Sequence, residues 1–276
     1  MIDLVSIVRL LANNKKSKLF MGGKIMDHHR YCPSCQTIID EATDMCPSCA
    51  WKFNTSSGKP GTAIVRPATR PKIQCEVDLA TTIDRTGSSE RFQTGIPNTF
   101  EMIVSQLCAK AREVRVTLAT HGDIDEGQDF IVHTDRGTPQ QAIEDCKKIV
   151  YGGGGPPEEN HLDAIESLLN KVPWTADPSR ARSAILAFMT ADTKPTKSGI
   201  SAAELGKQIQ DKGILLYLVC EPTFNLQELA SSAEGLVFQI SNNPEPAEMQ
   251  KIAAQVGASI VATVAAGGTV PMTVPA

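Results

Sequence analysis

Two closely spaced cysteine pairs are the clearest chemical signal in the sequence. Cys32 and Cys35 flank a Pro-Ser dipeptide, Cys46 and Cys49 flank the same dipeptide, and ten residues separate the pairs. Each pair can form a knuckle that presents two thiolates, and two knuckles supply the four sulfur ligands of a tetrahedral Zn²⁺ site. Four thiolates leave no position for water or substrate, so we expect a structural zinc. A redox Cys-x-x-Cys pair is the alternative, but it needs no duplication.

The segment around these cysteines is predicted to be a zinc ribbon over residues 26–54. Its residues between the pairs have the length of a short hairpin, and so small a module depends on the metal for its folding energy. Acidic residues outnumber basic ones here, and the whole chain has a net charge of −4. This charge opposes binding to phosphate backbones, so nucleic acid is not a favoured partner. The aromatic residues Tyr31, Trp51 and Phe53 either dock a protein or pack on the ribbon core.

From residue 73 onward, segments with the pattern of strands and helices alternate. This alternation predicts an α/β fold with a doubly wound, mostly parallel, Rossmann-type sheet that helices cover on both faces. The predicted strands are 73–83, 114–119, 130–133, 184–189, 214–219 and 236–240. The predicted helices are 97–113, 140–150, 161–172, 202–212, 226–233 and 246–264.

A second group of polar residues is predicted to meet at the carboxyl ends of two strands. Asp84, Thr86 and Ser88 follow the first strand, and Asp192 follows the strand at 184–189. In a doubly wound sheet with the order 3-2-1-4-5-6, strands 1 and 4 are neighbours at the switch point, where ligands bind. Two carboxylates and two hydroxyls would converge there. Such hard oxygen ligands suit Mg²⁺.

These residues belong to a longer pattern that resembles the von Willebrand factor A (vWA) domain. Asp84-Arg-Thr-Gly-Ser resembles the first motif of that family, the glycine-rich run at 152–158 resembles the second, and Asp192 resembles the third-motif aspartate. The resemblance covers nearly all of residues 73–265. It implies a metal-ion-dependent adhesion site in which an acidic side chain of a partner completes the coordination of Mg²⁺.

The sequence departs from the family pattern in the glycine-rich loop. Related proteins often have a metal-binding threonine or an aspartate where this chain has Gly155 and Pro156. The site is therefore degenerate, and two states stay open, with and without Mg²⁺. Glu158 is a candidate to compensate for the missing ligand.

The chain is predicted to have five segments. Residues 1–25 are an N-terminal extension, 26–54 the ribbon, 55–72 a linker rich in Pro, Gly and Ser, 73–267 the vWA-like domain and 268–276 a loose tail or an extra strand. The codons for Gly22 and Gly23 can form a bacterial ribosome-binding site just before Met26, so translation is predicted to begin at Met26. Residues 1–25 carry five basic residues and one acidic residue, so a chain from Met26 has a net charge of −8.

Several other classes of protein find little support in the sequence. No apolar run reaches the ~18 residues that span a bilayer, and the glycine-rich run lacks the Lys-Ser/Thr of a phosphate-binding loop. The acidic loop of Asp123, Asp125, Glu126 and Asp129 is either a Ca²⁺ site or a solvated connection. Widely spaced cysteines without an export signal indicate reduced, buried thiols and a cytoplasmic protein. These are Cys75, Cys108, Cys146 and Cys220.

The sequence therefore predicts a protein-binding adaptor and not an enzyme. Its partner would present an acidic or switch-like surface to the crevice at Asp84 and Asp192, and by analogy with the family it would work in a signalling, stress-response or AAA-ATPase-linked complex. The alternative is a subunit of a nucleic-acid-processing complex in transcription or repair. A metal-assisted hydrolase has less support, because His121, His133 and His161 have no evident nucleophile partner.

Overall fold

The computed structural model describes residues 29–31, 38–40, 73–155, 158–241 and 244–273. The chain forms two compact units, residues 1–70 and 71–276. In the first unit, β1 (His29–Tyr31) pairs antiparallel with β2 (Ile38–Asp40). In the sequence this strand pair flanks the first cysteine pair, whereas the predicted hairpin lay wholly between the two pairs. The four cysteines of the predicted zinc ribbon lie outside the described residues.

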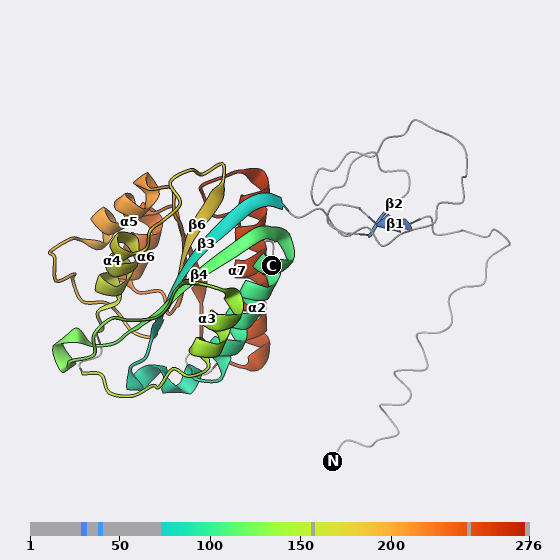
Figure 1. Cartoon of the computed structure of the whole chain (residues 1–276). Coiled ribbons are helices and arrows are strands. Elements are labelled where there is room, and N and C mark those ends of the chain that lie inside the picture. Colours follow the sequence, from blue (N-terminus) through green and yellow to red (C-terminus); the bar gives the residue numbers. More distant parts are fainter. Residues whose placement is uncertain (1–28, 32–37, 41–72, 156–157, 242–243, 274–276) are drawn as a thin grey trace, which may run out of the picture. The chain divides into compact units, whose positions relative to one another are not determined.

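The second unit is built on a six-stranded sheet with the order β5-β4-β3-β6-β7-β8 (Figure 1). β5 is antiparallel to β4, and the other neighbouring strands are parallel. Counted along this unit, the order is 3-2-1-4-5-6, which confirms the predicted α/β fold with a doubly wound, mostly parallel sheet. The strands are β3 (Ile73–Asp84), β4 (Ala111–His121), β5 (Ile131–Gly137), β6 (Ala181–Phe188), β7 (Leu215–Cys220) and β8 (Leu236–Gln239).

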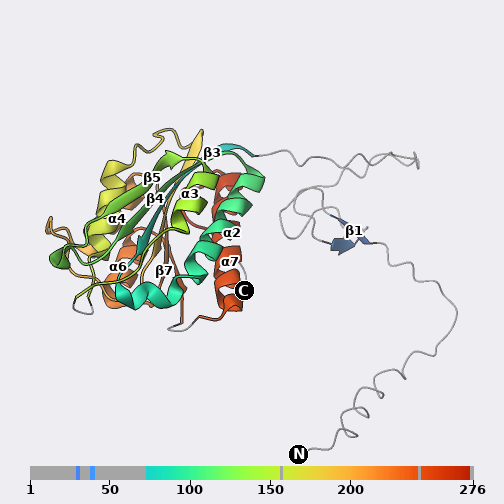
Figure 2. The same cartoon turned by 60° about the horizontal axis from the view of Figure 1, so that its bottom comes forward.

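Helices cover both faces of the sheet, as Figures 1 and 2 show. On one face lie α2 (Gly95–Lys110), α3 (Pro139–Cys146) and α7 (Pro246–Ala266). On the other lie α4 (His161–Lys171), α5 (Ala202–Asp211) and α6 (Phe224–Ser232). The short 3₁₀ helices η1 (Gly87–Phe92) and η2 (Ile124–Glu126) follow β3 and β4.

The two faces of the central strands supply two hydrophobic cores. Alternate residues of β3 and β6 point to opposite faces, so Leu79 and Leu186 pack with α2 and α7 while Ala80 and Ile185 pack with α4 and α5. Every residue of β6 is buried, which explains the continuous apolar run in its sequence. These two rigid strands hold the segments that follow their carboxyl ends.

Two helices end earlier than the sequence predicted. α2 ends at Lys110 and not at 113, because Ala111 already pairs with Ile73 and begins β4. α3 ends at Cys146 and not at 150. The chain leaves α3 there and runs to the glycine-rich loop, where Gly152 N donates a hydrogen bond to Arg85 O.

Candidate binding crevice

The predicted site lies at the carboxyl ends of β3 and β6, which are neighbouring parallel strands. This end of the sheet is at the bottom of the domain in Figure 1, where η1 follows β3, and it comes forward in Figure 2. An open cleft of about 520 Å³ lies here. Its lining consists of Thr86, Ser88, Gly153, Gly154, Gly155, Glu158, Glu159, Thr190, Ala191 and Asp192. We call it the crevice.

Asp84 is fully buried beneath the crevice, and its carboxylate accepts hydrogen bonds from two of the hydroxyl groups that line the crevice. Its Oδ1 accepts hydrogen bonds from Thr86 N at 2.9 Å and Thr86 Oγ1 at 2.8 Å, and its Oδ2 accepts one from Thr190 Oγ1 at 2.7 Å. Burial acts to raise the pKa of Asp84. Nearby His161 and His121, with the hydrogen bonds from Thr86 and Thr190, outweigh burial and hold this pKa below its ordinary value.

The hydroxyls of Thr86, Ser88 and Thr190 form one connected network. Ser88 Oγ lies 2.9 Å from Thr86 Oγ1 and 3.1 Å from Thr190 Oγ1, and Ser89 Oγ lies 2.8 Å from Thr190 Oγ1. The sequence motif predicted Thr86 and Ser88 but not Thr190. Thr190 could have been found as the hydroxyl residue two positions after the last buried residue of β6 and two before the predicted Asp192.

Asp192 lines the crevice but lies outside this network. β6 ends at Phe188, one residue before the predicted end at 189, and Asp192 follows four residues later. The carboxylate of Asp192 instead accepts a hydrogen bond from the next backbone amide, Thr193 N, at 2.8 Å. The structure therefore brings Asp84, Thr86 and Ser88 together as predicted, and it places Asp192 on the wall of the same crevice.

The glycine-rich loop forms the wall of the crevice on the β3 side. Gly87 N donates to Gly153 O at 2.9 Å. Gly153 and Gly154 have φ angles of +72° and +95°, which L side chains rarely adopt. A side chain at Gly154 would also come within 3.1 Å of Thr86 Cβ. Glycine therefore lets the loop lie directly on the hydroxyl network.

Glu159, and not Glu158, is the buried acidic residue of this loop. Glu158 is exposed, whereas the side chain of Glu159 is buried and its Oε2 has no hydrogen-bond partner. Burial and the negative charges of Asp84 and Asp123 raise the pKa of Glu159 to about 7. Its backbone pairs with Thr193 in an isolated bridge, and this local pairing fixes which of the two glutamates faces inward. Nothing in the sequence distinguished them.

The acidic loop after β4 is engaged by lysines. Lys194 Nζ contacts Asp123 Oδ1 at 2.7 Å and Asp125 Oδ2 at 3.0 Å, and Lys197 also pairs with Asp125. Asp123 is fully buried and its Oδ2 has no partner. The Lys194 ammonium group therefore lies where a Ca²⁺ ion would lie if the acidic loop were a Ca²⁺ site. It connects the loop that follows β4 with the loop that follows β6.

Two buried histidines lie below Asp84. His121 Nδ1 lies 2.8 Å from Thr82 Oγ1, and His121 Nε2 lies 2.7 Å from His161 Nδ1. Burial and the neighbouring His161 lower the pKa of His121 to about 3, and burial also lowers the pKa of His161. Their side-chain partners are Thr82 and each other, so they do not form a Ser-His pair of the kind that activates a nucleophile.

The potential metal ligands in the crevice suit a hard cation. They are all oxygens: three hydroxyls and the carboxylates of Glu159 and Asp192, with Asp84 behind them. Mg²⁺ prefers oxygen ligands and keeps several waters, and the partnerless Oε2 of Glu159 is a buried acceptor that a cation would satisfy. Within the described residues, no three His, Cys, Asp or Glu side chains form a metal-binding group. Hydroxyls would therefore supply much of the coordination.

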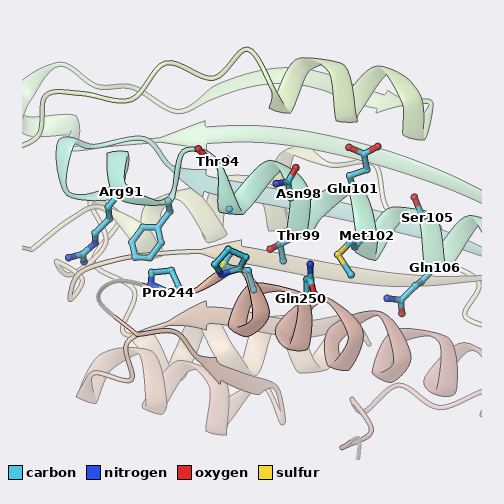
Figure 3. A pocket seen from close by; sticks show the side chains of 14 residues that line it. Arg91, Thr94, Asn98, Thr99, Glu101, Met102, Ser105, Gln106, Pro244 and Gln250 are labelled. Atoms are coloured by element: carbon cyan, nitrogen blue, oxygen red, sulfur yellow. The ribbon is translucent and has the colours of Figure 1, made fainter. Parts of the chain in front are cut away.

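A larger cleft of about 710 Å³ lies between α2 and α7, away from the crevice (Figure 3). Met102 and Met249 contribute apolar surface, and Asn98 and Gln250 contribute amides. It holds none of the residues that the sequence motifs singled out.

Comparison with known proteins supports the fold. No family model matches the sequence, and no curated protein matches it either. Among the solved structures that are similar in fold are the following two. The crystal structure of the SpRpn10 VWA domain is 15% identical, has a TM-score of 0.52, and is matched over 64% of this chain and 94% of that chain. Proximal thread matrix protein 1 from the mussel byssus is 14% identical, has a TM-score of 0.52, and is matched over 67% of this chain and 46% of that chain.

These similarities bear out the predicted vWA-like fold, while the zinc ribbon falls outside the described residues. None of the helices that the structure describes is long and apolar enough to cross a bilayer.

Proposed function

We propose that this chain is a cytoplasmic, non-catalytic adaptor that binds another protein at the crevice. The observation that carries the proposal is the arrangement around Asp84, whose buried carboxylate fixes the Thr86 and Thr190 hydroxyls at the mouth of an open cleft. The buried carboxylate is already stabilised by hydrogen bonds, and the described hydroxyls of the crevice have no hydrogen bond to a histidine. Such a site is suited to hold a ligand and not to activate a nucleophile.

The partner we favour presents an acidic side chain. Ser88, Thr190, Glu159 and Asp192 would hold Mg²⁺, and the bound ion supplies the positive charge that draws a carboxylate to this otherwise negative crevice. Thr86 and Thr190 already donate their hydroxyl protons to Asp84, so the Ser88 hydroxyl would donate to the remaining carboxylate oxygen of the partner. The partner therefore has an acidic or switch-like surface, as expected for adaptors in signalling, stress-response or AAA-ATPase-linked complexes; this assignment of a pathway rests on analogy with vWA-like proteins.

The proposed binding of Mg²⁺ can be tested on the purified full chain. We expect Mg²⁺ to bind saturably by calorimetry and to shift the amide resonances of Ser88 and Thr190. Ser88→Ala should weaken binding at least tenfold, because one hydroxyl ligand is lost. Ser179→Ala is the matched control, since that exposed serine precedes β6 at the other end of the sheet and donates to Asp177. Equal Mg²⁺ affinity in wild type and Ser88→Ala would refute the metal ligands proposed here.

The ribbon is proposed to hold one structural Zn²⁺ through Cys32, Cys35, Cys46 and Cys49, and to dock a second partner. Metal analysis of the purified chain should find about one zinc per molecule. Cys35→Ser or Cys46→Ser should release the zinc and unfold the ribbon, while the melting transition of the larger unit stays unchanged. Carefully prepared wild-type protein without zinc would contradict this part of the proposal.

A further inference from the structure

Two large apolar side chains protrude at the end of the sheet where the crevice lies. Phe224 is 77% exposed and Val150 is 79% exposed, the highest values among the exposed large hydrophobic residues that the structure describes. A single exposed apolar residue is ordinary on a protein surface. These two differ because each belongs to a segment that hydrogen bonds to the walls of the crevice.

Phe224 is joined to the crevice through loop residues after β6. It is the first residue of α6 and follows the carboxyl end of β7. The next residue, Asn225, donates from Nδ2 to Thr193 O at 3.4 Å, and Thr193 N donates to Asp192 Oδ1 at 2.8 Å. Asp192 lines the crevice. Phe224 therefore flanks the crevice on the β7 side.

Val150 is joined to the opposite wall. It lies two residues before Gly152, whose N donates to Arg85 O at 2.9 Å and whose O accepts a hydrogen bond from Gln128 Nε2 at 2.6 Å. Arg85 follows β3 and Gln128 follows β4, and the sheet order puts β4 and β7 on opposite sides of the β3–β6 pair. Val150 follows α3 and Phe224 begins α6, and these two helices lie on opposite faces of the sheet.

We propose that Phe224 and Val150 are the apolar anchors of the partner-binding surface, one on each side of the crevice. This inference rests on the proposed function and extends it to the chemistry of the partner. The partner is a protein segment with an acidic side chain at its centre and an apolar side chain on either side.

The physical reason is that the two kinds of contact do different work. The carboxylate meets the Ser88 hydroxyl and the bound cation, which fixes the register of the segment. Exposed aromatic residues make good anchors because they bury a large area at a small cost in conformational entropy. Burial of a phenylalanine side chain corresponds to about tenfold or more in affinity.

A displayed library of random peptides with a fixed central aspartate tests this inference on the full chain in buffer with Mg²⁺. We expect enriched peptides to carry large apolar residues on both sides of the aspartate. A synthetic peptide of the enriched sequence should bind Phe224→Ser about tenfold or more weakly, and Val150→Ser more weakly than wild type. Val270→Ser is the control, because Val270 is 46% exposed but lies in the tail after α7. Its affinity should not change.

The outcomes separate this inference from the proposed function. Peptides that need the aspartate and the Ser88 hydroxyl, but bind Phe224→Ser and Val150→Ser as well as wild type, overturn the apolar anchors and leave the proposed function standing. A library with no enriched peptide, or peptides whose binding is unchanged in Ser88→Ala and after Asp→Asn in the peptide, overturns both. Circular dichroism of each variant shows that it is folded, which we expect because the substituted side chains are mostly exposed.

Discussion

Both ends of the sheet bury carboxylates, but only one end neutralises them with arginine. At the amino end, Arg115 contacts both Glu76 and Asp78, and Arg112 and Arg136 add further contacts. The Arg115 guanidinium and the other arginines lower the pKa of Glu76 to about 2. At the carboxyl end, Glu159 is just as buried, yet its Oε2 has no partner and its pKa is raised to about 7.

The difference separates a structural cluster from the proposed binding site. The acidic groups at the amino end are matched by arginines within the domain, so no ligand is needed there. At the crevice the nearest ammonium group, that of Lys194, is already held by Asp123 and Asp125. Buried polar atoms without partners are costly. What most distinguishes the crevice is that none of the ion pairs between described residues involves Glu159, whereas Glu76 Oε2, which likewise has no hydrogen bond, lies 2.8 Å from the Arg115 guanidinium.

The largest effect on stability is expected from Arg115→Leu at the amino end. This change leaves Glu76 and Asp78 buried with weaker counter-charges, which should lower the free energy of unfolding by about 3–5 kcal/mol. Urea denaturation at neutral pH measures it. Arg180→Ala is the control, since that side chain is 61% exposed and its contact with Glu76 is long at 3.5 Å, and it should cost less than about 1 kcal/mol. Equal losses for both variants would remove the contrast between the two ends.

A smaller loss is expected from Lys194→Met at the crevice end. The change leaves the buried carboxylate of Asp123 without its ammonium partner, which should cost about 2–3 kcal/mol. The double variant Asp123→Asn with Lys194→Met should recover part of this stability, because no unpaired charge then remains. No recovery in the double variant would mean that Lys194 acts through packing alone.

The smallest effect, and one of opposite sign, is expected from Glu159→Gln. The folded-state pKa near 7 lies above the ordinary value of about 4.3. The folded protein therefore holds this proton more tightly, and its stability falls as the pH rises from about 4 to 7. The glutamine variant lacks this loss and should be about 1 kcal/mol more stable than wild type at pH 8 without metal.

Thermal melts of wild type and Glu159→Gln across this pH range measure the difference. Added Mg²⁺ should raise the melting temperature of wild type more than that of the variant, because binding to the folded state stabilises it. A wild type that is as stable at pH 8 as the variant, with or without Mg²⁺, would contradict the charge assigned to Glu159.

Much of this architecture could be predicted from residue patterns. The continuous apolar run of β6 and the alternation of strands with helices predicted the strand order, and the order in turn placed Asp84, Thr86 and Ser88 at one switch point. Helix ends were less predictable, because Ala111 extends β4 only when β3 is beside it. The roles of Glu159 and Lys194 could not be assigned from sequence. The role of Glu159 depends on which of two adjacent glutamates turns inward. The role of Lys194 depends on a contact with Asp123, which is 71 positions away in the sequence.

The most direct test of the account is the affinity of the chain for its native protein partner when the crevice is altered without disturbing Asp84. Ser88→Ala combined with Asp192→Asn removes one hydroxyl and one charge from the crevice wall, and both side chains are at least partly exposed. Calorimetry with the partner isolated from the host should show a fall in affinity of about 100-fold for the folded double variant, and a similar fall for wild type with chelator. A folded double variant that binds the partner as tightly as wild type would contradict the assignment of the crevice as the binding site.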